Sequence, residues 1–231
     1  MTPAFLARQD DEPVRTRIKF CGFTRAEDVD AAVALGVDAL GFVFYPASPR
    51  ALTPAQARAL VTRVPPSIAT VGLVVDASPD ELARLLDTVP LTVLQFHGDE
   101  TPEQVAAVDR PRIKAARVEP KLDLLEFARL HAGADLLLLD SHSAGYGGSG
   151  LSFDWSLVPA SLIGPASRPR IMLGGGLHAG NVVEALTRLR PFAVDTSSGI
   201  ESAKGIKDVR AMKAFVAAVR DHDRMTNTKD R

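Results

Sequence analysis

The sequence is poor in the residues that build several common kinds of site. Its 231 residues include one cysteine, so an internal disulfide is impossible and zinc or iron–sulfur sites built on several cysteines are excluded. The five histidines are scattered, without the H-x-H or H-E-x-x-H spacing of metal ligands. The sequence therefore predicts no metal site.

An excess of charge of one sign and a long apolar run are also missing. The 27 Lys and Arg residues nearly balance the 28 Asp and Glu residues, so the chain lacks the basic character of a general nucleic-acid-binding protein. No apolar run approaches the roughly 18 residues of a membrane span. The first residues lack the basic and then apolar segments of a secretory signal. We expect a cytoplasmic protein that binds neither nucleic acid nor membrane.

Short apolar runs alternate with segments of helical spacing along the whole chain. About eight such units of roughly 29 residues each predict an α/β fold, a single (β/α)8 barrel, and a doubly wound open sheet is the alternative because alternation cannot show closure. The runs that predict buried strands, rich in β-branched, aromatic or leucine residues, are 18–21, 39–44, 71–75, 93–96, 113–118, 136–139, 170–173 and 192–196.

No linker rich in Pro, Gly or Ser divides the chain, so we expect one catalytic domain over residues 18–220. Residues 1–17 and 221–231 are polar, and we interpret them as a flexible extension and a flexible tail. Pro159 interrupts the segment 153–162, which predicts only a short or distorted helix there.

Ionisable residues stand at the carboxyl ends of several expected strands, where barrel enzymes place their chemistry. The alternation of side chains along the first strand puts Lys19 and Cys21 on the inner face. Most lone cysteines are inert core residues, but a neighbouring ammonium is expected to lower the pKa of the thiol. Asp140 ends the sixth strand, either as a cap of the next loop or as an acid or base. Asp195 faces inward on the last strand.

Glycine clusters follow the last two strands, at the places where barrels commonly hold a phosphate through backbone N–H groups. A turn that needs a positive φ would also select glycine, so each cluster alone is a weak signal. The cluster residues that we expect to bind phosphate are Gly175, Gly176, Ser198 and Gly199.

Three further features have two interpretations each. Arg50, in S-P-R after the second strand, is a surface charge or a bidentate partner for a carboxylate. His97, in Q-F-H-G-D-E, lines the site or bonds to a backbone carbonyl. The run G-Y-G-G-S-G at 145–150 matches G-x-G-x-x-G but lies in a long loop, so we interpret it as a mobile lid rather than a dinucleotide motif.

Taken in order, these stretches resemble the phosphoribosylanthranilate isomerase family of tryptophan biosynthesis, and they cover nearly everything from residue 18 to about 217. The matching stretches are K-F-C-G-F-T-R with E-D (19–28), L-G-F-V-F with S-P-R (40–50), V-G-L-V-V-D (71–76), L-Q-F-H-G-D-E (94–100), L-L-L-D with G-Y-G-G-S-G and F-D-W (137–155), G-G-L with N-V (175–182), and V-D-T-S-S-G-I-E with G-I-K-D (194–208).

The resemblance implies a barrel without cofactor or metal that carries out an Amadori rearrangement. The implied substrate is N-(5-phospho-β-D-ribosyl)anthranilate, and the implied product is 1-(2-carboxyphenylamino)-1-deoxy-D-ribulose 5-phosphate. Cys21 would be the general base and Asp140 the general acid. Arg50 would hold the anthranilate carboxylate, Asp195 would help to position the anthranilate nitrogen, and the two glycine loops would hold the phosphate.

We also expect Lys19 and His97 to contact the substrate, and the protein to act as a monomer or homodimer. Two other functions compete with this one. Aminoimidazole carboxamide ribotide isomerases and their dual-substrate relatives use an aspartate as base on the first strand, where this chain has Cys21. A phosphosugar-binding barrel without catalysis would need neither Cys21 nor Asp140.

Overall fold

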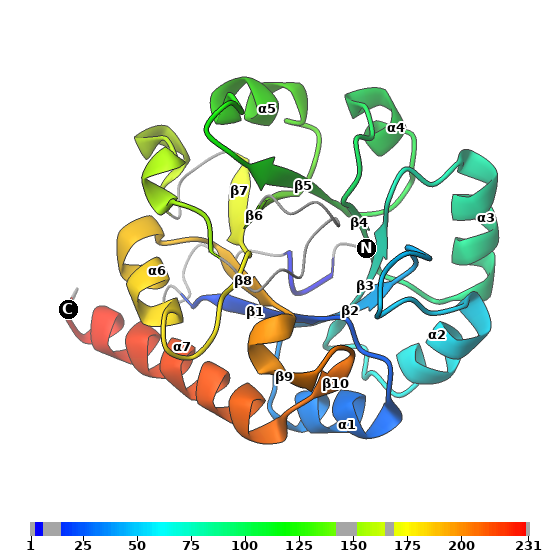
Figure 1. Ribbon diagram of the computed structural model, residues 1–231, viewed down its shortest axis with the longest axis horizontal. Helices are drawn as coiled ribbons and strands as arrows, with labels where there is room; N and C mark the ends of the chain where they lie inside the picture. The colour runs from blue at the N-terminus through cyan, green and yellow to red at the C-terminus, as the bar shows by residue number, and fades with distance from the viewer. Residues whose placement is uncertain (1–2, 7–14, 142–151, 165–168, 230–231) are drawn as a thin grey trace.

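The computed structural model describes residues 3–6, 15–141, 152–164 and 169–229. Its eight parallel strands form a closed barrel in which β8 bonds back to β1 (Figure 1). This closure confirms the predicted (β/α)8 fold and excludes the open sheet. The strands are β1 Arg17–Cys21, β2 Ala39–Val43, β3 Ala69–Val74, β4 Val93–Phe96, β5 Arg112–Val118, β6 Leu136–Ser141, β7 Arg170–Leu173 and β8 Ala193–Thr196.

Helices surround the barrel (Figure 1). They are α1 Ala26–Ala34, α2 Pro54–Val61, α3 Pro79–Thr88, α4 Pro102–Ala106, α5 Leu124–Leu130, α6 Val182–Leu189 and α7 Val209–Lys229. Three of them begin with a capping box followed by proline, on Thr53, Ser78 and Thr101. The cap side chain accepts an otherwise unpaired N–H, and proline needs no acceptor, so the sequence itself sets these starts.

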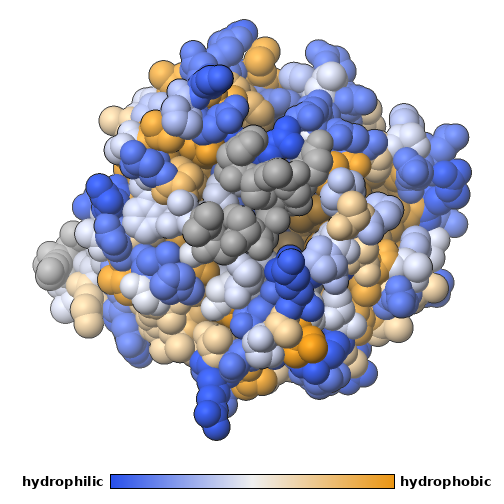
Figure 2. Space-filling view, viewed as in Figure 1, coloured by the Kyte–Doolittle hydropathy of each residue, from blue (hydrophilic) through white to orange (hydrophobic). Residues whose placement is uncertain are grey.

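The segment before β7 forms two short 3-10 helices, η1 Trp155–Leu157 and η2 Ala160–Leu162, with Pro159 as the N-cap of the second. The prediction of a short or distorted helix is confirmed. Within the described ranges, no helix is both long and apolar enough to cross a membrane. The face of the molecule in Figure 2 shows hydrophilic and hydrophobic residues interspersed around the rim.

Two apolar cores position the strands. The larger one lies between the sheet and the helices, and it includes Phe20, Phe42 and Leu94. The smaller one fills the barrel with inward-facing residues such as Val93 and Leu138. Successive side chains of each strand alternate between the helices and the barrel interior. The polar side chains at the carboxyl ends of the strands that continue the inward-facing positions therefore lie at that end of the barrel.

The N-terminal extension differs from the predicted flexible polar segment. Phe5 and Leu6 are 2% and 1% exposed, and they pack with the inner core at the amino ends of the strands. Arg170 donates a hydrogen bond to the Leu6 carbonyl at 2.9 Å, and its guanidinium lies 4.6 Å from the Phe192 ring centroid. The prediction was wrong at these residues because two apolar side chains in a polar run suffice to cover the open floor of the barrel.

The predicted flexible tail over 221–231 is also corrected, because α7 continues to Lys229. The buried carboxylate of Asp223 accepts hydrogen bonds from the Thr16 N–H at 2.9 Å and the Thr16 hydroxyl at 2.7 Å. Arg220 donates to the Thr16 carbonyl at 2.7 Å. The polar composition of this segment reflects a helix face that binds the chain entering β1.

A short hairpin, β9 Glu201–Ala203 and β10 Ile206–Lys207, follows β8 through the 3-10 turn η3 Ser198–Ile200. Neither element was predicted from the sequence. The hairpin lies against the end of the barrel beside β1 (Figure 1), and Lys207 donates hydrogen bonds to the carbonyls of Cys21 and Ser197.

Candidate active site

Ionisable side chains gather inside the barrel at the carboxyl ends of its strands. Lys19 and Cys21 on β1, Asp140 on β6 and Asp195 on β8 are all buried. Lys19 is paired with Asp195 in the register of β1 and β8. The structure therefore brings together the residues that strand alternation had placed on one inner surface.

Lys19 and Asp195 form an ion pair, with Nζ 2.8 Å from Oδ1. Burial by itself disfavours the charged lysine, but the negative charges of Asp195 and an ionised Cys21 outweigh it and raise the pKa of Lys19. The structure does not contradict a contact with substrate at either residue, and their expected substrate-binding roles stay predictions.

The pKa of the Cys21 thiol differs from the expectation. Burial raises it, and the cation of Lys19 opposes this effect while Asp195 reinforces it, so the pKa of the thiol lies above its ordinary value. Lys19 does favour the thiolate, as expected, but its effect is smaller than that of burial. The expected lowering of the thiol pKa by Lys19 is therefore present, but burial outweighs it, and the sequence does not show how completely the barrel removes water from Cys21.

A glycine makes room for the thiol. Gly41 on β2 is paired with Cys21 in the β1–β2 register. A Cβ at position 41 would lie 2.6 Å from the Cys21 Sγ, closer than any side chain tolerates. The glycine in the L-G-F sequence of β2 is therefore required for the packing of the Cys21 side chain.

Asp140 lies beside a buried histidine, which in turn contacts a buried glutamine. The His97 Nε2 lies 3.2 Å from the Asp140 Oδ2, and the His97 Nδ1 lies 2.9 Å from the Gln95 amide nitrogen. The Ser141 N–H donates to the Asp140 Oδ1 at 2.8 Å. With the Gln95 amide as donor to Nδ1, the proton of a neutral imidazole is on Nε2, which lies near the Asp140 carboxylate but forms no hydrogen bond with the described residues. His97 thus faces Asp140, and the expected alternative, a bond to a backbone carbonyl, is not formed within the described part of the chain.

Arg50 is buried and forms a bidentate pair with Glu201, which sequence reasoning missed. The Arg50 Nε donates to the Glu201 Oε1 at 2.8 Å, and Nη2 donates to Oε2 at 2.6 Å. The Lys207 Nζ donates to the Glu201 Oε1 at 2.8 Å. Burial raises the pKa of Glu201, but the two cations outweigh it and the pKa is lowered overall. Both partners belong to the matching stretches S-S-G-I-E and G-I-K-D, which was the only signal for them.

The two glycine loops touch each other. Gly175 and Gly176 have φ values of +75° and +65°, which favour glycine. A Cβ at Gly199 would lie 2.0 Å from the Leu177 carbonyl oxygen, so the loop after β8 packs directly on the loop after β7. Among the described residues, the N–H groups of Gly176, Ser198 and Gly199 donate to no protein acceptor. They are free to bind an anion, as expected for a phosphate site.

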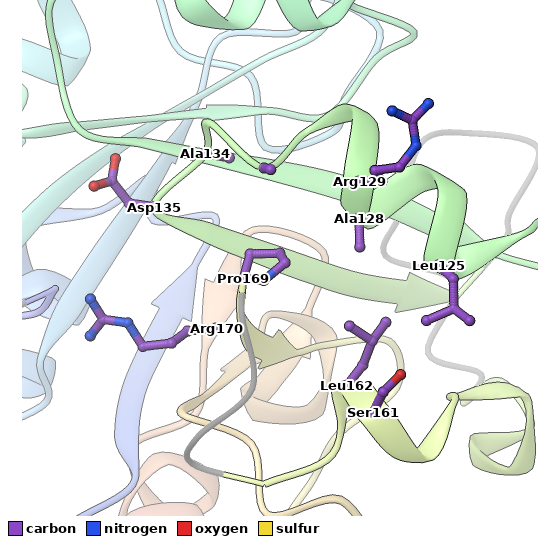
Figure 3. A pocket seen from close by; sticks show the side chains of 10 residues that line it. Leu125, Ala128, Arg129, Ala134, Asp135, Ser161, Leu162, Pro169 and Arg170 are labelled. Atoms are coloured by element: carbon purple, nitrogen blue, oxygen red, sulfur yellow. The ribbon is translucent and has the colours of Figure 1, made fainter.

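The glycine-rich run 145–150, interpreted as a lid, lies outside the described residues. Within the described ranges, no group of three or more His, Cys, Asp or Glu side chains is placed to hold a metal ion. A cavity of about 490 Å³ lies outside the barrel, between α5 and η2 (Figure 3). Its lining includes Leu125, Arg129, Ala134, Asp135, Leu162 and Arg170, from α5, η2 and the amino ends of β6 and β7.

A closed parallel barrel with buried ionisable groups at the carboxyl ends of its strands is the arrangement of the (β/α)8-barrel enzymes. Residues 18–218 match the family of N-(5'-phosphoribosyl)anthranilate (PRA) isomerases. A relative from Methylibium petroleiphilum, named N-(5'-phosphoribosyl)anthranilate isomerase, is 55% identical over 210 residues, which is 91% of this chain and 96% of the relative. The chain therefore belongs to the phosphoribosylanthranilate isomerase family, whose members catalyse a step of tryptophan biosynthesis.

Solved structures agree with this assignment. One is a phosphoribosylanthranilate isomerase in complex with reduced 1-(o-carboxyphenylamino)-1-deoxyribulose 5-phosphate; it is 34% identical with a TM-score of 0.78, covering 89% of this chain and 99% of its own. Another consists of monomers generated from the dimeric enzyme of Thermotoga maritima, 33% identical with a TM-score of 0.78 and the same coverage.

Proposed function

We propose that this enzyme converts N-(5-phospho-β-D-ribosyl)anthranilate into 1-(2-carboxyphenylamino)-1-deoxy-D-ribulose 5-phosphate, with Cys21 as general base and Asp140 as general acid. The observation that carries the proposal is the placement of a buried thiol and a buried carboxyl group on the inner rows of β1 and β6. The reduced product analogue bound by a relative has the same carboxyphenylamino and phosphate ends, which supports this substrate class.

Two ends of the substrate need holding. Arg50 binds the anthranilate carboxylate, since its guanidinium is buried and fixed beside the barrel mouth. The N–H groups of Gly176, Ser198 and Gly199 bind the phosphate. Asp195, held by Lys19, helps to position the anthranilate nitrogen. Binding both ends fixes the ribose carbons between the acid and the base.

The reaction needs one proton delivered and one removed. Asp140 gives its proton to the furanose ring oxygen, the C1′–O bond breaks, and the nitrogen lone pair forms an iminium. The Cys21 thiolate then takes the proton from C2′, and the electron pair of that C–H bond forms the enolamine, which tautomerises to the ketone. Over the reaction Cys21 gains one proton and Asp140 loses one. Proton exchange with water then returns both side chains to their starting protonation states.

His97 supports this reaction through Asp140. Its Nε2 lies 3.2 Å from the Asp140 Oδ2, and Gln95 contacts the other nitrogen of the ring. A ring held at this distance limits the positions that the Asp140 carboxyl group can take during proton delivery. Contact of His97 with the substrate itself stays a prediction.

The test follows the loss of fluorescence of freshly made phosphoribosylanthranilate with the purified enzyme. We expect Cys21→Ala to lower kcat by at least about 10²-fold, the usual scale for a general base, without a change in fold. Near-normal turnover by Cys21→Ala would remove the thiol from the mechanism. Absence of turnover by the wild-type enzyme would reject the substrate.

We also propose that the enzyme works in the cytoplasm as a monomer or homodimer, without nucleic acid or membrane partners. The near balance of 27 basic and 28 acidic residues supports the absence of a nucleic-acid partner. The dimeric relative from Thermotoga maritima makes a homodimer the first state to test. Sedimentation at several concentrations measures the assembly, and cell fractionation measures the location.

A further inference from the structure

The β9–β10 hairpin carries two buried ionisable groups that the proposed reaction does not use. The side chain of Glu201 is 5% exposed and that of Lys207 is 0% exposed. Burying two charges is costly unless each is well paired, so their presence beside the barrel mouth calls for a physical reason. The reason follows from what each of them contacts.

Lys207 is surrounded by acceptors. Four oxygen atoms lie within hydrogen-bond distance of its Nζ: the carbonyls of Cys21 and Ser197, the Ser197 hydroxyl at 3.4 Å and a Glu201 carboxylate oxygen. The Phe23 ring centroid lies 5.5 Å away. An ammonium has three donors and no lone pair, whereas a neutral amine would present a lone pair to these oxygens. The surroundings therefore hold Lys207 in its charged form, although burial lowers its pKa.

Glu201 occupies only one edge of the Arg50 guanidinium. It accepts from Nε and Nη2, which form the side edge of the planar group. The end edge, with Nη1 and the second N–H of Nη2, makes no hydrogen bond with the described residues. Because the guanidinium is a rigid fork, holding one edge fixes the direction of the other. A second carboxylate can bind at that end while Glu201 stays in place.

The net charge of the buried cluster of Arg50, Glu201 and Lys207 depends on Lys207. One carboxylate, that of Glu201, lies between two cations, so one positive charge is left over. Without Lys207, the buried pair of Arg50 and Glu201 would be neutral and would attract an incoming carboxylate far less. Lys207 also binds the Cys21 carbonyl, so the same ammonium fixes the end of β1 that carries the thiol.

We propose that Glu201 and Lys207 are positioning residues for the isomerisation. Glu201 directs the free edge of Arg50 at the substrate carboxylate, and Lys207 keeps the positive charge of Arg50 available while holding the carboxyl end of β1. This inference rests on the proposed function, in which Arg50 binds that carboxylate and Cys21 is the base.

The experiment is a charge-balance cycle on the full-length enzyme. We expect Lys207→Met to raise KM for phosphoribosylanthranilate by at least about tenfold. Adding Glu201→Gln to Lys207→Met removes the competing carboxylate, so the charge of Arg50 is no longer neutralised by a neighbour. KM of the double variant should therefore fall back toward the wild-type value. If the hairpin only stabilised the fold, the double variant would bind no better than Lys207→Met, and that result would overturn the proposal.

Two controls keep the cycle interpretable if a variant is destabilised. Lys204→Met removes the same charge from an exposed site in the same hairpin, and should leave KM unchanged. Lys207→Arg keeps the charge and should keep KM within a few-fold of the wild type. Equal effects of Lys204→Met and Lys207→Met, or equal loss in Lys207→Arg and Lys207→Met, would contradict the proposed role of the Lys207 charge.

The pH dependence of kcat/KM separates the proposed role of Lys207 from a purely structural one, because loss of stability alone would not shift it. The charged groups around the thiol are Lys19 on β1, Asp195 on β8, Lys207 on β10 and Arg50 after β2. Removing the Lys207 cation disfavours the thiolate, so the ascending limb of kcat/KM should move to higher pH in Lys207→Met. An unmoved limb would contradict the link between Lys207 and Cys21.

The outcome for Arg50 separates this inference from the proposed function. If Arg50→Ala leaves KM unchanged, the assignment of the substrate carboxylate fails first. If Arg50→Ala raises KM but Lys207→Met does not, only the positioning role of the hairpin is wrong.

Discussion

A single side chain, Cys21, shows how far local reasoning reaches at the scale of the residue. Strand alternation places it correctly on the inner face with Lys19, because that relation depends only on backbone geometry. Whether its pKa is raised or lowered depends on complete burial and on Asp195, a residue far away in the sequence that is paired with Lys19. The sequence shows the types of charge but not which of these effects is larger.

The same limit applies to Arg50. The S-P-R stretch identified it as a candidate, while Glu201 and Lys207 belong to a hairpin over 201–207 that is too short to show a periodic pattern. A contact between residues so far apart in sequence becomes visible only when the barrel closes.

At the same scale, Asp140→Asn should remove most of the activity and the alkaline limb of the pH profile of kcat/KM. The wild-type rate falls at high pH because the acid must be protonated, and at low pH because the thiol must be ionised. Asn keeps the size of the side chain and an acceptor for the Ser141 N–H, but it cannot deliver a proton. Wild-type rates with an unaltered profile would assign proton delivery to another group.

Arg50→Ala should raise KM more than it lowers kcat. The substrate carboxylate keeps its charge throughout the reaction, so its partner stabilises the ground state and the transition state alike. Steady-state kinetics with phosphoribosylanthranilate measure the two parameters. A variant with an unchanged KM would show that the carboxylate binds elsewhere.

At the scale of the element, the sequence located the eight strands closely. The predicted run 93–96 coincides with β4, and the predicted run 18–21 lacks only the first residue of β1. Buried parallel strands are continuous apolar runs, which a local reading detects. The β9–β10 hairpin and the last turns of α7 were missed because their stability comes from contacts with β1 and Thr16 rather than from their own composition.

The last turns of α7 therefore support the start of β1. We expect Asp223→Ala to destabilise the protein by about 1–3 kcal/mol, because the buried N–H and hydroxyl of Thr16 lose their common acceptor. Denaturant unfolding measures the loss, and KM should not change. Asp221→Ala, at a half-exposed position two residues earlier, is the matched control with an effect within about 0.5 kcal/mol. Equal effects of the two substitutions would contradict a specific support.

At the scale of the whole molecule, the two ends of the barrel differ in composition. Ionisable groups gather at the carboxyl ends of the strands, whereas Phe5 and Leu6 cover the amino ends. The repeated strand–helix pattern predicted the number of units, but closure is a property of all eight strands together and appears only in the structure. The covering of the floor by the N-terminal segment could not be predicted for the same reason.

A chain that starts after residue 6 should lose thermal stability and keep its kcat/KM. Phe5 and Leu6 bury nearly all of their apolar surface, worth about 1.5–3 kcal/mol for each side chain. For a protein of this size, each kcal/mol lowers Tm by about 2–4 °C. A thermal melt together with kinetics checks both parts. An unchanged Tm would show that Phe5 and Leu6 do not stabilise the barrel. A lower kcat/KM would show that the amino-terminal end of the barrel affects the site at the carboxyl ends of the strands.

The presence of a single cysteine has a practical consequence for studying how ligands come and go. A thiol-directed reagent added to the wild-type chain reads one position, Cys21, with no background from other cysteines. Because this thiol is 5% exposed, its labelling rate measures how often the site admits a probe of a given size. The slowing of that rate by a bound product analogue then reports occupancy and residence time. The natural sequence thus contains its own reporter, and no engineered label is needed.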